Sequence, residues 1–244
     1  MKKLILAIGL TAFASSAAFA GSHMQAVRMG TEGAYPPYNF VNDNGEVDGF
    51  ERELGDLLCE IAALDCTWVT NDWDSIIPNL VSGNYDAIIA GMSITEERDE
   101  VIDFTQAYFP PDPSAYVGLA GMGEEAAMGV VAVQSGTIQA SHVASTGATA
   151  LEFATPDETV AAVRNGEADA VLADRGFLAD IVAEDSEMEF IGGDVWLGSG
   201  IGVGLRESDA ELKAKLDAAI TVLKEDGRLA ELIAKWFDGM VAEF

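Results

Sequence analysis

The chain has 244 residues, of which 49% are hydrophobic, and it carries a formal net charge of −28. A surface with so much negative charge repels nucleic-acid phosphates and anionic lipids, which excludes a general nucleic-acid binder. The hydrophobic content is too high for a disordered acidic chain, so we expect the acidic residues to coat a folded protein. The length suits one large domain or two small ones.

The N-terminal segment predicts export from the cytoplasm. Two lysines precede an apolar run over residues 4–13, and small residues follow up to Ala20. These are the three regions of a secretory signal, so we expect residues 1–20 to be a cleaved signal peptide and the protein to be periplasmic. The alternative is a membrane anchor, for which the apolar run is too short. Residues 21–24 look like a cloning remnant.

Signals for strands and helices then alternate along the chain. Helical stretches have apolar residues at helical spacing, and residues 85–92 form the continuous apolar run of a buried parallel strand. The alternation predicts an α/β fold with parallel sheets. In chain order, we expect a strand at 26–30, a helix at 49–64, a strand at 66–70, a helix at 74–82, strands at 85–92 and 129–134, helices at 137–145 and 157–165, a strand at 169–173, and helices at 175–183, 209–225 and 228–241.

Two parts of the chain resemble each other. Residues 74–90 align with residues 157–173 at a constant offset of 83 positions, with five identities in register. Any helix–strand unit of this class has a somewhat similar sequence. These identities, however, include the Gly that ends the helix and the Asp that precedes the strand. We therefore predict two similar lobes.

Two lobes of this kind predict a cleft between them. Ligands of open α/β sheets lie beyond the carboxyl ends of the strands, which here are Gly91 to Ser93 in one unit and Asp174 in the other. The proline-rich segment 110–113 and the glycine-rich segment 196–204 are the candidate crossings between the lobes. The expected boundaries are residues 25–110 plus 200–244 for lobe 1 and residues 113–198 for lobe 2.

The cysteines favour a disulfide and argue against a metal site. Cys59 and Cys66 are the only two cysteines, and an even count in an exported chain favours pairing; the alternative is two buried free thiols. His142 lies too far away in sequence to complete a metal site with them. The glycine run at 198–204 does not open a helix, as a dinucleotide site would require, so we expect no cofactor.

Several motifs together resemble the periplasmic solute-binding proteins of polar amino-acid ABC transporters. The most specific are T-E-G-A-Y at residues 31–35 and S-I-T-x-x-R at residues 93–98, and the likeness covers nearly all of residues 25–240. It is nearest to the lysine/arginine/ornithine- and histidine-binding group and the related opine-binding proteins. The resemblance implies a two-lobed type II (Venus-flytrap) fold with a hinge of two crossing segments. It also implies the short disulfide of that group, between Cys59 and Cys66.

An amino-acid ligand needs a cation and N–H donors for its carboxylate. Arg98 is the candidate cation, because a guanidinium binds a carboxylate by a two-pronged fork. The alternative is a surface ion pair with a neighbouring acid. The helix that begins near Thr137 offers free N–H groups to the same carboxylate. The family often has a second Thr where this chain has Ile138, so backbone N–H groups must carry more of the contact.

The ligand's ammonium group needs an anion or several acceptors. Asp174 is the candidate anion, since a buried carboxylate at this strand end requires a cation; the alternative is a solvated pair with Arg175. Ser93 and the carbonyl of Gly91 could complete the ammonium site. The family often has Ser at Ala90 and Gly91, so side-chain contacts are reduced here.

The ligand's side chain has its own candidates. Tyr35 and Trp73 are possible walls for stacking and for cation–π attraction, with core packing as the alternative for each. Glu32 follows the first strand, where an acid of the basic-amino-acid binders meets a ligand cation, and Gln139 is a weaker candidate.

These residues predict a monomeric receptor that closes by hinge motion on arginine, lysine, ornithine or histidine and delivers it to an ABC permease. The ligand could instead be an opine or a neutral polar amino acid. A dehydratase-type enzyme on the same fold would need a poised acid or base, for which Glu32 is the candidate, but no nucleophile–base constellation is visible, so we expect no enzyme. A sensor ectodomain would need an attached transmembrane segment.

Overall fold

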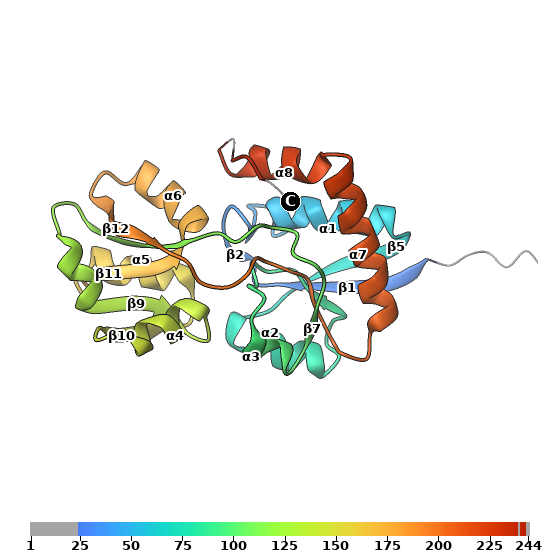
Figure 1. Ribbon diagram of the computed structural model, residues 1–244, viewed down its shortest axis with the longest axis horizontal. Coiled ribbons are helices and arrows are strands. Elements are labelled where there is room, and N and C mark those ends of the chain that lie inside the picture. Colours follow the sequence, from blue (N-terminus) through green and yellow to red (C-terminus); the bar gives the residue numbers. More distant parts are fainter. Residues whose placement is uncertain (1–23, 239, 243–244) are drawn as a thin grey trace, which may run out of the picture.

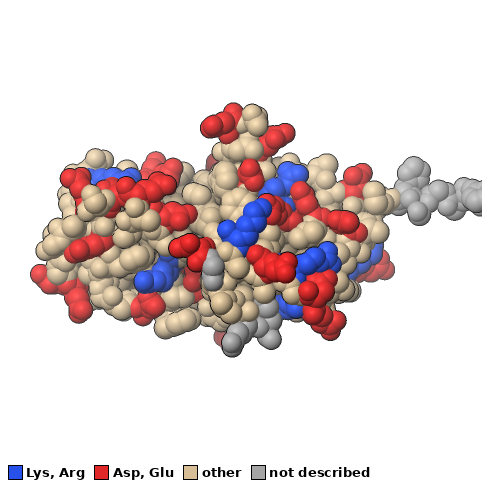
Figure 2. Space-filling model, turned by 90° about the horizontal axis from the view of Figure 1, so that it is seen from above, with Lys and Arg blue, Asp and Glu red and all other residues tan. Residues whose placement is uncertain are grey.

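The computed structural model describes residues 24–238 and 240–242, which form two lobes side by side (Figure 1). Each lobe is built around a five-stranded sheet, with strand order β5-β1-β6-β13-β7 in lobe 1 and β10-β9-β11-β8-β12 in lobe 2. The expected signal peptide, residues 1–20, and residues 21–23 of the expected remnant at 21–24 lie outside the described residues. Acidic side chains are spread over both lobes on the face that Figure 2 shows, with Lys and Arg among them in a few places.

Lobe 1 holds both ends of the described chain. Its first helix, α1, buries Phe50, Leu54 and Leu58 completely against the sheet, which is the apolar spacing that the sequence predicts. Gly49 precedes it with φ of 112°, and a Cβ there would lie 2.7 Å from the carbonyl oxygen of Tyr38. The elements are β1 (Gln25–Thr31), β2 (Ala34–Tyr35), β3 (Asn39–Val41), β4 (Val47–Asp48), α1 (Phe50–Ile61), β5 (Leu64–Thr70), α2 (Trp73–Val81), β6 (Ala87–Ile88), α3 (Glu96–Asp99), β7 (Asp103–Phe104), β13 (Gly204–Leu205), α7 (Ala210–Glu225) and α8 (Arg228–Trp236).

Lobe 2 is formed by the middle of the chain. Its helix α5 begins with a capping box, in which Thr155 and Glu158 bond to each other's backbone N–H groups. The elements are β8 (Ser114–Leu119), a 3₁₀ helix η1 (Glu124–Met128), β9 (Val130–Gln134), α4 (Ile138–Ser145), β10 (Thr149–Phe153), α5 (Pro156–Arg164), β11 (Ala170–Asp174), α6 (Arg175–Glu184) and β12 (Met188–Val195).

The expectation of parallel sheets is wrong for part of each sheet. β13 pairs antiparallel with β6 and β7, and β8 pairs antiparallel with β11 and β12. Both strands follow a crossing between the lobes, so the chain enters the sheet from the cleft side and runs away from it. The remaining central strands, such as β1, β6, β9 and β11, run toward the cleft.

Some element boundaries also differ from the expected ones. The strand expected at 85–92 is a ladder only at Ala87–Ile88, because β1 pairs with it at these two residues alone and β13 reaches it only through Gly204. The last helix ends at Trp236 rather than at 241, since Asp238 adopts a positive φ of 45°.

The two crossings run next to each other between the lobes (Figure 1). Ile201 of the second crossing forms antiparallel bridges with Ser93 and with Phe109, which directly precedes the first crossing. The N–H of Tyr108 also donates to the carbonyl of Ile201 at 2.8 Å. This pairing forms a hinge of two crossing segments, as the resemblance implies.

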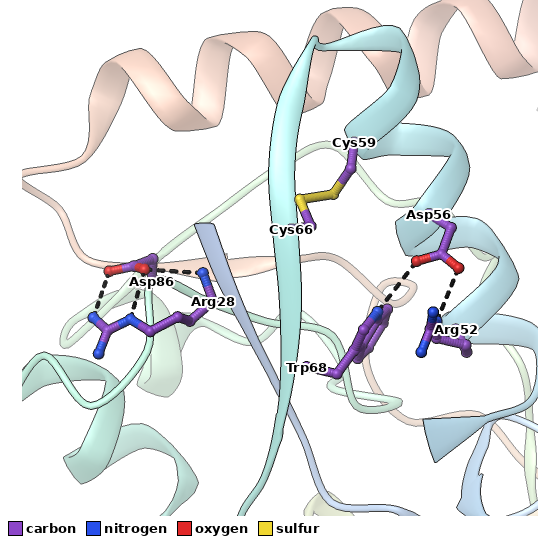
Figure 3. The surroundings of a disulfide bond; sticks show 7 residues. All are labelled: Arg28, Arg52, Asp56, Cys59, Cys66, Trp68 and Asp86. Atoms are coloured by element: carbon purple, nitrogen blue, oxygen red, sulfur yellow. Dashed lines mark hydrogen bonds and ion pairs between the residues drawn. A yellow bond between two sulfur atoms is a disulfide. The ribbon is translucent and has the colours of Figure 1, made fainter. Parts of the chain in front are cut away.

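The disulfide between Cys59 and Cys66 is confirmed and joins the last turn of α1 to β5 (Figure 3). In the same view, Arg28 of β1 bonds to Asp86, and Asp56 of α1 accepts from Arg52 and from the indole of Trp68. Among the described residues, no helix is long and apolar enough to cross a membrane, and no cluster of acidic, His or Cys side chains could hold a metal ion.

Candidate functional site

A cavity lies between the lobes, at the carboxyl ends of β1, β6, β9 and β11. The structure brings all ten residues that the sequence singles out for the ligand to its wall, and adds two more, Ala90 and Gln134. Gln134 was missed as a site residue, although it is the last residue of β9 and the strand-end rule points to it. The lining residues are Glu32, Tyr35, Trp73, Ala90, Gly91, Ser93 and Arg98 from lobe 1, and Gln134, Thr137, Ile138, Gln139 and Asp174 from lobe 2.

Arg98 supplies the positive charge of the cavity. Its backbone N–H bonds to the hydroxyl of Thr95, which caps α3, and its guanidinium donates to the carbonyl of Ser93 at 2.8 Å. The guanidinium lies 5.3 Å from the ring of Trp73 and forms no ion pair with an acid among the residues described. Burial lowers its pKa to about 10, so the guanidinium stays protonated at neutral pH. Some of its N–H groups remain available to donate to a ligand.

The N-terminus of α4 faces the same cavity. Thr137 is its N-cap: the hydroxyl accepts from the N–H of Ala140 at 3.1 Å and donates to the carbonyl of Gln134 at 2.7 Å. The N–H groups of Ile138 and Gln139 have no intrahelical acceptor, because the first intrahelical bond runs from the N–H of Ser141 to the carbonyl of Thr137. They therefore remain available to an anion. The hydroxyl of Thr137 is therefore used in the cap, which leaves backbone N–H groups as the donors at this helix end.

Asp174 faces Arg98 from the other lobe. Its carboxylate accepts from the hydroxyl of Tyr35 at 3.0 Å and from the amide of Gln139 at 2.9 Å. It does not pair with Arg175, which bonds to Asp194 instead at 2.7 Å. Desolvation, and next the negative charge of Asp112, raise the pKa of Asp174 to about 7. A cation placed here would restore the ionised form.

Glu32 forms a second negative pole. Its Oε1 accepts from Nε2 of Gln134 in the opposite lobe at 2.6 Å. Desolvation, and to a smaller extent repulsion from Asp72, Asp74 and Asp157, raises the pKa of Glu32 to about 7. Within the described part of the chain, no Lys or Arg pairs with this carboxylate. A ligand cation is the natural partner for it.

The two aromatic candidates are less free than the sequence suggests. The ring of Tyr35 stacks on Phe177 of lobe 2, with centroids 4.4 Å apart, and on Tyr38 at 5.5 Å. Much of the Tyr35 ring is therefore packed in the core, and its hydroxyl is the group that contacts Asp174. Trp73 is half-buried, stands beside Arg98 and donates from its indole to the carbonyl of Gly136 at 3.4 Å. Tyr38 is fully buried, in line with a core role.

The lobes are in contact across the cavity. The bonds from Gln134 to Glu32 and from Tyr35 to Asp174 both join residues of different lobes. The same residues therefore line the cavity and hold the lobes together, which is the arrangement of a site that closes around what it binds.

Comparison with known proteins assigns the chain to a family. The family model for bacterial extracellular solute-binding proteins, family 3, matches residues 27–239. The chain belongs to this family.

Two characterised relatives of this family-3 protein are binding proteins. It is 32% identical to the lysine/arginine/ornithine-binding periplasmic protein of Escherichia coli, over 98% of each chain. It is 30% identical to the octopine-binding periplasmic protein of Rhizobium meliloti, over 89% of this chain and 92% of the relative.

A solved structure is more similar still. The periplasmic His/Glu/Gln/Arg/opine family-binding protein of Silicibacter pomeroyi, in complex with lysine, shares 67% identity with the chain. The match covers 89% of this chain and all of the other, with a TM-score of 0.87. The type II fold that the sequence resemblance implies is therefore confirmed.

Proposed function

We propose that this family-3 protein is a periplasmic receptor that binds a cationic amino acid between its lobes and delivers it to an ABC permease. One observation carries the proposal: the cavity holds one guanidinium, Arg98, and two carboxylates, Glu32 and Asp174, that have no ion-pair partner among the described residues. This charge pattern is complementary to a molecule with one carboxylate and two cations, which describes lysine, ornithine and arginine. The relative from Escherichia coli is a lysine/arginine/ornithine-binding protein, and the Silicibacter pomeroyi structure is a complex with lysine, both in line with this pattern.

In this proposal each pole has a role. The fork of Arg98 and the amide groups at Ile138 and Gln139 bind the ligand's carboxylate. Asp174 binds its ammonium group, assisted by Ser93 and the carbonyl of Gly91. Glu32 binds the side-chain cation, and Trp73 and Tyr35 flank the aliphatic stem.

Contacts from both lobes explain why binding favours closure. Arg98 and Glu32 belong to lobe 1, while Asp174 and the start of α4 belong to lobe 2. A ligand that bridges them stabilises the closed state by its contacts to both lobes, which is the condition for shifting a two-state equilibrium. The permease would bind this closed form. We also propose that the protein acts as a monomer without catalytic activity, after removal of residues 1–20.

The experiment is a thermal-shift and calorimetric screen with L-lysine, L-arginine, L-ornithine, L-histidine, L-glutamine and octopine. A ligand present at 100 times its Kd should stabilise the protein by about 2.7 kcal/mol. We expect the cationic amino acids to bind most tightly. A response to glutamine or octopine alone would contradict the proposed ligand class.

Two substitutions test the proposed poles. Arg98→Ala and Asp174→Ala should each weaken binding at least about a hundredfold, because each leaves a buried charge of the ligand without its partner. Arg228→Ala is the matched control, since Arg228 lies in an exposed ion pair with Asp226. Unchanged affinity in both cavity variants would refute the proposal.

A further inference from the structure

A buried carboxylate lies directly behind the cavity wall. Glu51, the second residue of α1, has no exposed surface. Its Oε2 accepts from the side-chain amide of Asn39 at 2.7 Å, and its Oε1 accepts from the N–H of Gly91 at 2.6 Å and from the hydroxyl of Tyr108. Burial raises its pKa, and no cation among the residues described contributes to holding it. Three hydrogen-bond donors alone satisfy this side chain.

The three donors belong to the segments that form the site. Asn39 also accepts, through its Oδ1, from the N–H of Gly33 at 2.7 Å, next to Glu32. Gly91 lines the cavity and lies two residues before Ser93, whose carbonyl holds the Arg98 guanidinium. One carboxylate therefore connects the segment that carries Glu32 with the segment that leads to Arg98.

The third donor connects this pair to the hinge. Tyr108 is fully buried just before the first crossing, and its N–H donates to the carbonyl of Ile201 in the second. Glu51 is thus bonded to the point where the two crossings pair.

The direction of each hydrogen bond is determined by chemistry. The N–H of Gly91 and the amino group of Asn39 can only donate, so both oxygens of Glu51 must accept. Asn39 cannot turn its amide around, because the N–H of Gly33 needs its oxygen. A buried carboxylate without a cation is costly, and an apolar side chain would avoid that cost. A second role would account for its presence.

We propose that Glu51 is a positioning residue of the ligand site, which, together with Asn39, holds the Glu32 and Gly91 segments in register with each other and with the hinge. This inference rests on the proposed function only in taking the cavity as the ligand site. It applies to a cationic and to a neutral amino acid alike.

Exchanging the polarity of the pair provides the test. Glu51→Gln brings one amide N–H₂ against another donor, and Asn39→Asp brings two carboxylates together, so each single variant breaks the connection. In the double variant N39D/E51Q, the new carboxylate at position 39 accepts from Gly33 and from the new amide at position 51. That amide's oxygen still accepts from Gly91 and Tyr108. The net charge of the pair is the same as in the original protein.

Calorimetry with L-lysine and with L-glutamine gives the first measurement. For whichever of these ligands binds more tightly, we expect each single variant to raise Kd at least about tenfold. The double variant should recover to within about threefold of the wild-type Kd. The control Tyr85→Phe removes another buried hydroxyl bond, to the carbonyl of Ile76, and should lower the melting temperature without changing Kd. Wild-type affinity in both single variants, or a double variant as weak as both losses combined, would overturn the proposal.

Amide hydrogen exchange of the ligand-free protein gives the second measurement. Exchange at Gly91 and Gly33 should accelerate in Glu51→Gln and return to the wild-type rate in the double variant. If neither amino acid binds the wild type, the proposed function fails, and the exchange rates alone decide the role of Glu51. Unchanged exchange in Glu51→Gln would then refute it.

Discussion

Binding of a cationic amino acid should release protons, because the two cavity carboxylates are partly protonated when the cleft holds no cation. Desolvation raises the pKa of both Glu32 and Asp174 to about 7. A ligand cation needs the ionised form of each, so affinity should be full above pH 7 and fall as the pH decreases through that value.

The size of the effect follows from the two pKa values. A group with a pKa of about 7 is roughly one-tenth ionised at about pH 6 and nine-tenths ionised at about pH 8, so each carboxylate changes Kd about tenfold across this range. The wild type should therefore lose about a hundredfold in affinity for L-lysine between those pH values. At about pH 7, close to one proton should be released per ligand bound.

Glu32→Gln isolates one of the two carboxylates. The variant should retain only the contribution of Asp174, which is a change of about tenfold in Kd and about half a proton released at neutral pH. Calorimetry in two buffers of different ionisation enthalpy measures both quantities, and Glu167→Gln, an exposed acid of lobe 2, serves as the control. A Kd for the wild type that does not change between pH 6 and pH 8 would refute the reasoning.

Two further predictions concern stability. Replacing Cys59 and Cys66 together by Ser should lower the free energy of unfolding by about 2 kcal/mol, because a short closed loop is released in the unfolded chain, and leave ligand affinity unchanged; chemical denaturation and calorimetry measure the two. Arg28 and Arg206 both bond to Asp86 and lower its pKa to about 2. This contribution is present above the ordinary Asp pKa and is lost as the pH falls through about 2, so Asp86→Asn should weaken the acid dependence of the melting temperature; an identical acid profile would argue against it.

Much of the fold could be predicted because local signals and global arrangement agree. The apolar spacing of α1 and the internal repeat predicted a helix and two lobes that the structure contains. Strands β8 and β13 were missed, and with them the antiparallel pairing, since the orientation of each depends on where the chain re-enters a lobe after a crossing. No periodicity within the six residues of β8 or the two of β13 encodes that path.

The sequence predicted which residues line the site, but not the hydrogen bonds among them. The strand-end rule selected Asp174 and the segment leading to Arg98, and the resemblance selected Glu32. Gln134 was missed, because a glutamine at a strand end has no charge pattern that distinguishes it. The fully buried Glu51 was also missed, since an acid in the first turn of a helix ordinarily faces solvent and stabilises the dipole.

The sequence by itself therefore determined the α/β class, the two lobes and the set of polar groups at the strand ends, because these depend on spacing along the chain. Only the tertiary structure decided which of them pair. Glu32 meets Gln134 across 102 positions, and Tyr35 meets Asp174 across 139. Such partners are set by how the lobes dock and by how much water is excluded between them. That exclusion is also what raises the pKa of the two carboxylates and makes a ligand cation their missing counterpart.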